Sequence, residues 1–150
     1  MRITAFSDVC LRVVMLLAAE PTPALITSRT IADGVATPYN HVTKAISRLR
    51  ELDLVDVVRG RTGGVQISAF GRTATVGWLL RQLDPRLDLA GCETHAGTCP
   101  LIAGCQLRCA LRRAREAFYG ELDDLVIADM LHSRTSGPVP VTLLTRPSGT

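Results

Sequence analysis

The sequence predicts a mainly helical fold with one small β-hairpin, and three features lead to this prediction. Apolar residues recur at helical spacing in several segments, and the last of these segments is long. Two short β-type runs flank a glycine-rich stretch, which is the pattern of a hairpin. The chain has 150 residues, of which 47% are apolar and 21% charged, so it can form a real core and is not a disordered protein.

The first helix is expected at 4–19, where Thr4 can cap the start and an apolar face carries Cys10, Val13, Val14, Leu17 and Ala18. A short second helix is expected at about 29–33, with its cap and stop signals supplied by Thr27 or Ser28 and by Gly34. A break follows, in which Thr37 can cap a third helix and Pro38 fits its first turn.

The third helix is expected at about 39–52, with one apolar face and one polar, basic face. Two short helices joined by a tight turn, the second polar outward, form the layout of a helix-turn-helix. Between residues 37 and 50 there are three cations and no acid, as expected of a surface that faces phosphates. We expect this part of the chain to read DNA through Thr37, Tyr39, Asn40, His41, Lys44 and Arg48.

A β-hairpin is expected directly after the third helix, formed by the runs 54–58 and 65–68. Its glycine-rich tip carries Arg59 and Arg61, and arginines at such a tip suit a minor groove, where negative potential concentrates. A solvent loop with incidental arginines is the alternative. The order of helix, turn, helix and basic hairpin favours a winged helix-turn-helix with Arg59 and Arg61 as further DNA contacts.

The second half predicts four more features: a helix at about 72–83, a loop rich in Gly, Thr and Cys, a long helix from 105 to about 120, and a short helix to 131 capped by Asp123. The long helix has an apolar stripe that a second copy of the chain would bury. The expected division is a winged helix-turn-helix DNA-binding domain at 1–84, a cluster-binding loop at 85–104, a dimerisation helix with the short following helix at 105–131, and a flexible tail at 132–150.

Four of the five cysteines fall between residues 92 and 109 in the pattern C-x6-C-x5-C-x3-C. Because the N-terminus lacks a signal-peptide layout, we expect a cytoplasmic protein whose thiols serve metal or redox chemistry. Structural zinc sites use pairs spaced two to four residues apart, so the wider gaps favour an iron–sulfur cluster over zinc. Cys92, Cys99 and Cys105 are the expected ligands; Cys109, one turn after Cys105, is either a fourth ligand or a small apolar residue.

The N-terminal helix, the winged helix with an RGRTGG tip and the spaced cysteines before a long helix resemble a family of bacterial iron–sulfur winged-helix repressors, the NsrR/IscR/RirA type. The resemblance covers about residues 1–131. Through FSDVCLR, TPYNHVTKAISRL, GRTATVGWLLRQLD, CPL and AREAFYGELD, the chain is most similar to nitric-oxide-sensing NsrR proteins of actinobacteria.

The resemblance implies a [4Fe–4S] cluster, with [2Fe–2S] as the alternative, held by Cys92, Cys99 and Cys105. The histidine ligand of the IscR branch falls on Arg108, so that pattern is broken. In the nitric-oxide-sensing branch an aspartate from the partner subunit is the fourth ligand, and Asp8 occupies that place, with Cys109 as its rival.

The resemblance further implies a homodimeric repressor that binds two DNA half-sites and releases operators of nitric-oxide detoxification genes when nitric oxide attacks the cluster. Two alternatives stay open: an iron or iron–sulfur status regulator with the same DNA-binding head, and a zinc or thiol-redox regulator. An enzyme is not expected, because His41, His95 and His132 have no evident nucleophile partner and the glycine-rich tip lacks the P-loop lysine.

Overall fold

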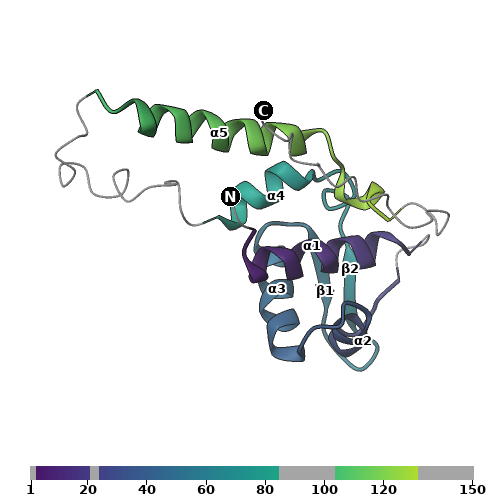
Figure 1. Ribbon diagram of the computed structural model, residues 1–150. Helices are drawn as coiled ribbons and strands as arrows, with labels where there is room; N and C mark the ends of the chain where they lie inside the picture. Colours follow the sequence, from purple (N-terminus) through teal and green to yellow (C-terminus); the bar gives the residue numbers. More distant parts are fainter. Residues whose placement is uncertain (1–2, 21–23, 85–103, 132–150) are drawn as a thin grey trace, which may run out of the picture.

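The computed structural model describes residues 3–20, 24–84 and 104–131. Its elements are α1 (Ala5–Ala18), α2 (Ser28–Gly34), α3 (Tyr39–Glu51), β1 (Val55–Val58), β2 (Gly64–Ile67), α4 (Val76–Leu83), α5 (Gln106–Asp123) and the 3-10 helix η1 (Ile127–Asp129). Figure 1 shows α4 between α5 and α1, with α2, α3 and the hairpin on the other side of α1. The prediction of a mainly helical fold with a small hairpin is confirmed.

Helix α1 lies at the centre of the core. Thr4 Oγ1 accepts a hydrogen bond from Ser7 N at 3.1 Å, which caps the helix as predicted. Cys10, Val13 and Val14 are completely buried, and α1 packs chiefly against α3 and η1. Because α1 contacts elements from both halves of the chain, the helix-turn-helix and the segment after α5 share one hydrophobic core.

The turn between α2 and α3 differs in detail from the prediction. Helix α2 is capped by Thr27 and includes Gly34, and the left-handed residue after it is Ala36, with φ of 49°. Thr37 does not cap α3: its hydroxyl donates to the carbonyl of Val35 at 3.1 Å, and α3 begins directly after Pro38 without a side-chain cap. The N-cap residue of α3 is Pro38, which has no side-chain acceptor, and the Thr37 hydroxyl is turned towards the preceding turn instead.

The hairpin has the predicted antiparallel pairing, with Val55 opposite Ile67 and Val58 opposite Gly64. At its tip Gly60 has φ of +117°, a conformation that favours glycine. A bridge between Ile26 and Val65, with N–H···O distances of 2.9 Å in both directions, ties the hairpin to the segment before α2.

Helix α4 begins at Val76, later than the expected start at 72, because residues 69–73 form turns. Ser68 Oγ accepts from Gly71 N at 2.8 Å and donates to the carbonyl of Asp53 at 2.6 Å, which stabilises these turns against helix. Asp123 was expected to cap a short helix, and this was wrong: it is the last residue of α5 and pairs with Arg81 of α4.

The expected boundaries of the cluster-binding loop and of the tail stay predictions, because residues 85–103 and 132–150 lie outside the described residues. Among the helices that are described, none has the length and hydropathy needed to cross a bilayer.

Candidate functional site

The first half of α3 carries the exposed polar side chains expected to read DNA. Asn40, His41 and Lys44 are exposed or partly exposed, Tyr39 is 44% exposed and Thr37 is half-buried. The apolar residues of α3 face the core, where Val42, Ala45 and Leu49 are completely buried. The helix is therefore held firmly on one side and presents a polar N-terminal half on the other, as a reading helix requires.

The tip of the hairpin lies at the same end of the molecule as the start of α3, away from α5 (Figure 1). Arg59 and Arg61 are both exposed at this tip. Gly63 allows the tight turn between them and β2, because a Cβ there would lie 2.2 Å from the carbonyl oxygen of Val58. The fold thus brings the two parts of the predicted DNA surface together.

Arg29 of α2 belongs to this surface and was missed by the sequence analysis. Its guanidinium carbon lies 5.1 Å from the centre of the Tyr39 ring, a cation–π distance, and both residues are exposed. No local pattern indicates that Arg29 faces Tyr39 across the turn, so only the fold reveals this cation.

Arg48 differs from the other expected DNA contacts. It lies in the last turns of α3, and its guanidinium is used within the chain: Nη1 donates to Glu51 Oε2 at 3.0 Å and Nη2 to the main-chain carbonyl of Gln82 at 3.2 Å. At 1.5 Å per residue it lies roughly 13 Å along the helix from Tyr39, towards α4. Arg48 is directed away from the end of the molecule that carries the other candidates.

The structure describes two of the clustered cysteines, and they line one hollow at the start of α5. Cys105 is the N-cap of α5 and half-buried, and Cys109, one turn later, is exposed. The hollow has a volume of about 220 Å³ and is lined by Gly104, Cys105, Gln106, Arg108, Cys109 and Arg112. Cys92, Cys99 and His95 lie outside the described residues.

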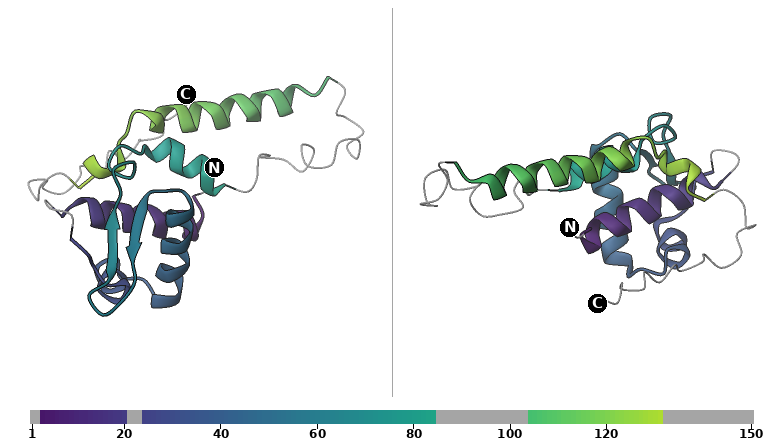
Figure 2. Two further views of the ribbon diagram at one scale, coloured as in Figure 1. Left: turned by 180° about the vertical axis from the view of Figure 1, so that it is seen from behind. Right: turned by 45° about the horizontal axis from the view of Figure 1, so that its top comes forward.

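Asp8 is not part of this hollow within one chain. It lies in the first turn of α1, with its side chain 49% exposed, and its Oδ2 accepts from Arg12 Nη2 at 2.8 Å. The three views of the ribbon show the Gly104 end of α5 reaching past α4, away from the start of α1 (Figures 1 and 2). Within the described part of one chain, Asp8 therefore does not meet Cys105 or Cys109.

The donor set around the hollow fits an anionic metal–sulfur group. Two thiols stand one helical turn apart, and thiolates are the usual ligands of iron–sulfur clusters. Cys105 forms no side-chain cap bond, and the start of a helix favours negative charge. Arg108 and Arg112 line the same hollow and add positive charge beside it. No group of three or more metal-binding side chains is preformed within the described ranges, so a complete site needs further ligands.

Cys10 has the structural role that the sequence suggested. It is completely buried in α1, and burial raises the pKa of its thiol to about 12 although the charge of Arg48 acts in the opposite direction. Such a thiol stays protonated at neutral pH, so Cys10 behaves as a small apolar core residue.

Two polar contacts fix α5 onto α4. Arg81 forms a two-pronged pair with Asp123, with one N···O distance of 2.9 Å, and its guanidinium lies over the Tyr119 ring at 5.0 Å. The hydrogen bond from Arg81 lowers the pKa of Asp123 and raises that of Arg81. Tyr119 donates to Asp84 Oδ2 at 2.6 Å, and burial together with this carboxylate raises the pKa of Tyr119 to about 12.

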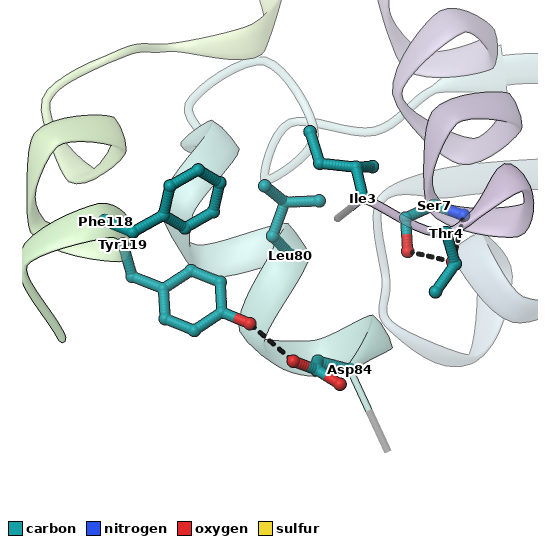
Figure 3. A pocket seen from close by; sticks show the side chains of 7 residues that line it. All are labelled: Ile3, Thr4, Ser7, Leu80, Asp84, Phe118 and Tyr119. Atoms are coloured by element: carbon teal, nitrogen blue, oxygen red, sulfur yellow. Dashed lines mark hydrogen bonds between the residues drawn. The ribbon is translucent and has the colours of Figure 1, made fainter. Parts of the chain in front are cut away.

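Figure 3 shows that the Tyr119–Asp84 bond closes one side of a small pocket where α4 and α5 meet the start of α1. The pocket is lined by Ile3, Thr4, Ser7, Leu80, Asp84, Phe118 and Tyr119. The C-cap residue of α4, Asp84, is thus anchored to α5 directly before the segment that carries Cys92 and Cys99.

A winged helix with an exposed polar reading helix, a basic hairpin tip and a hollow lined by thiols defines a DNA-binding regulator rather than an enzyme. The chain belongs to the Rrf2 family, described as iron-dependent transcriptional regulators, whose family model matches residues 3–133. The family resemblance inferred from the sequence is confirmed.

Several relatives match the chain over most of its length. The HTH-type transcriptional repressor NsrR of Streptomyces coelicolor is 44% identical over 99% of this chain and the whole of that protein. The HTH-type transcriptional regulator NsrR of Geobacillus kaustophilus is 31% identical over 91% of this chain and 93% of its own.

Solved structures share the fold. IscR of T. potens superposes with a TM-score of 0.65 at 20% identity, over 87% of this chain and 86% of that one. CymR, the global cysteine regulator of B. subtilis, has a TM-score of 0.65 at 22% identity, over 86% of this chain and 95% of its own.

Proposed function

We propose that this regulator is a homodimeric repressor whose [4Fe–4S] cluster senses nitric oxide and whose DNA binding ends when the cluster is lost. The observation that carries the proposal is the pairing of a DNA-reading end, formed by α3 and the hairpin tip, with a thiol-lined hollow at the start of α5. The similarity to the repressor NsrR of Streptomyces coelicolor and the sequence resemblance to nitric-oxide-sensing members support the same function.

A second copy of the chain is the proposed cover for α5. This helix has 18 residues, yet Tyr119 is its one buried residue within the described chain. Leu107 is 64% exposed, and Leu111 and Phe118 are only half-buried. A long helix with an uncovered apolar stripe is stabilised when a symmetry-related helix covers it. Such a dimer presents two reading helices to two half-sites about one DNA turn apart.

We propose that Cys92, Cys99 and Cys105 hold the cluster with Asp8 of the partner subunit. Asp8 is half-exposed and does not line the hollow of its own chain, so another copy can reach it. Its pair with Arg12 is exposed to solvent, and such pairs contribute little to stability, so Asp8 can leave it for a metal at small cost. Cys109 lines the same hollow as Cys105 and remains the rival fourth ligand.

When bound, the cluster supplies iron that reacts with nitric oxide, and an oxygen ligand among thiolates is its weakest corner. The chain's own part is mechanical. Asp8 lies in the first turn of α1, and α1 packs along α3 in the core. While Asp8 is held by the partner subunit's site, α1 fixes the position of the reading helix; once released, Asp8 returns to Arg12 and the two heads lose their spacing. Each good contact to a base that is lost when the heads are misaligned weakens DNA binding by about 1–3 kcal/mol.

The proposal is tested by anaerobic purification of the wild type, Asp8→Ala and Cys109→Ala, followed by absorbance and Mössbauer spectra with and without nitric oxide. The DNA readout uses a fragment selected from random sequence by the anaerobic wild-type protein. We expect a [4Fe–4S] spectrum in the wild type and in Cys109→Ala, and a changed cluster site and weaker nitric-oxide response in Asp8→Ala. Asp8→Ala that matches the wild type in cluster formation, nitric-oxide response and DNA affinity would contradict the ligand assignment. A colourless protein that contains zinc would instead support a zinc or thiol-redox regulator.

A second candidate is a regulator of iron or iron–sulfur supply with the same head, which the family's description as iron-dependent favours. Two anaerobic experiments separate the iron-supply regulator from the nitric-oxide sensor: a titration with nitric oxide and the removal of iron by a chelator, each with DNA binding as the readout. The nitric-oxide sensor releases DNA at stoichiometric nitric oxide, whereas a supply regulator responds to iron removal and keeps its DNA until iron is withdrawn.

A further inference from the structure

Arg48 links the reading helix to the helix that leads into the cysteine segment. Its Nη2 donates to the main-chain carbonyl of Gln82 at 3.2 Å, across 34 residues of sequence. Gln82 lies in the last turn of α4, which ends at Leu83. The last carbonyls of a helix have no partner within it, and a cation there is favoured by the helix dipole. Arg48 therefore caps the end of α4 from α3.

The end of α4 that Arg48 caps is also fixed to α5. Asp84, two residues after Gln82, accepts from Tyr119 at 2.6 Å, as Figure 3 shows, and Arg81 pairs with Asp123. The chain then runs directly into the segment that contains Cys92 and Cys99, while α5 begins just after Cys105. In the sequence, the segment with Cys92 and Cys99 therefore lies between Asp84, two residues after the carbonyl that Arg48 holds, and the start of α5.

The position of Arg48 argues against a DNA contact. The guanidinium is occupied by Glu51 and Gln82, and it lies near α4 rather than at the end of α3 that carries Tyr39, Asn40 and His41. The arginine is thus engaged with the chain itself, one helical turn beyond Lys44 and about two turns beyond His41.

We propose that Arg48 is a positioning residue that couples the cluster site to the reading helix through the carbonyl of Gln82, and that it does not contact DNA. This rests on the proposed function, in which the cluster-loaded dimer binds DNA more tightly than the apo form. The bond makes α3 follow any shift of the end of α4 relative to the core. Without the bond, α3 stays folded and packed on the core, but its position no longer depends on whether the cluster is bound.

The test compares DNA affinity of the cluster-loaded and apo full-length proteins under anaerobic conditions, with iron removed by a chelator. The variants are Arg48→Met, Arg48→Lys, which keeps a donor for the carbonyl, and Arg50→Met, a control for an exposed arginine on the same helix. Affinity is measured at several salt concentrations, and thermal unfolding checks that each variant is folded.

In Arg48→Met we expect the ratio of the DNA affinity of the cluster-loaded protein to that of the apo protein to fall by about two-fold to thirty-fold. The salt dependence of DNA binding should be unchanged. Arg48→Lys and Arg50→Met should keep the wild-type ratio. A salt slope reduced by about 0.9, with equal loss of affinity in both states, would make Arg48 a phosphate contact and overturn the proposal. An unchanged ratio in folded Arg48→Met, or a ratio that disappears in folded Arg48→Lys, would also overturn it. If the wild-type ratio itself is one, the proposed function fails together with the coupling.

Discussion

Replacing Gly77 with alanine should push α5 away from α4 and lower the stability of the protein. Gly77 is buried on α4, and a Cβ there would lie 2.2 Å from Asp123 Oδ1, 2.7 Å from the carbonyl oxygen of Tyr119 and 2.9 Å from Asp123 N. The carboxylate can rotate away, but the two main-chain atoms cannot. Because ordinary contact begins at 3.4 Å, the α5 backbone must retreat by roughly 0.7 Å, in a core that is already closely packed.

The cost follows from this displacement. Overpacking that shifts backbone costs about 2–3 kcal/mol, and the better helix propensity of alanine returns about 1 kcal/mol, so a net loss of roughly 1–2 kcal/mol is expected. For a chain of this size that lowers Tm by about 3–8 °C. The displaced Asp123 also loses its geometry with Arg81.

The assay is thermal unfolding at one protein concentration and one metal content, since binding partners shift Tm. Gly120→Ala is the matched control, because a Cβ at Gly120 meets nothing within 4 Å; it should raise stability by about 0.5–1 kcal/mol. If Gly77→Ala unfolds at or above the wild-type temperature while Gly120→Ala behaves as expected, the close approach of α4 and α5 is wrong.

Three further predictions concern the dimer, the buried thiol and the α4–α5 hydrogen bond. Leu107→Glu should give monomers in sedimentation velocity and weaken DNA binding at least about ten-fold, because charge on an interface core residue opposes burial. Arg113→Glu, at an exposed position of the same helix that does not line the cysteine hollow, should stay dimeric. In apo protein treated with iodoacetamide, peptide mass spectrometry should show rapid labelling of exposed Cys109 and none of buried Cys10 until the protein unfolds; equal rates would contradict the packing of α1. The contribution of Tyr119 to the free energy of unfolding is fully present below pH 10 and disappears as the pH rises towards about 12, because the folded Tyr119 keeps its proton longer than the unfolded one. Denaturant titrations at high pH should therefore show that the free energy of unfolding declines less steeply with pH in Tyr119→Phe than in the wild type.

The elements of this fold could be predicted because their signals are local. Thr4 and the apolar spacing of α1 act within a few residues, and the glycine-rich tip specifies the hairpin without help from the rest of the chain. The wrong predictions concern residues whose roles depend on partners far away in the sequence. Asp123 is the last residue of α5 and pairs with Arg81, 42 residues away, and no local pattern distinguishes such a residue from a helix cap.

The candidate site, like the fold, could be predicted only where neighbouring residues determine it. One helical turn separates Cys105 and Cys109, so their common hollow follows from spacing alone. The role of Arg48 could not be predicted, because an arginine on a polar helix face looks the same whether it meets a phosphate or a carbonyl 34 residues away. The proposed role of Asp8 could not be derived from one chain either, because Asp8 does not line the hollow that Cys105 and Cys109 share, and its described partner is Arg12.

The central claim, that this chain couples a nitric-oxide-sensitive [4Fe–4S] cluster to DNA binding, is tested most directly by one anaerobic titration. Nitric oxide is added to the cluster-loaded protein on its selected DNA, while cluster absorbance and DNA occupancy are recorded from the same sample. Under this coupling, we expect DNA to be released in step with the loss of cluster absorbance and Asp8→Ala to uncouple the two signals. DNA that stays bound after the cluster absorbance has gone would contradict it.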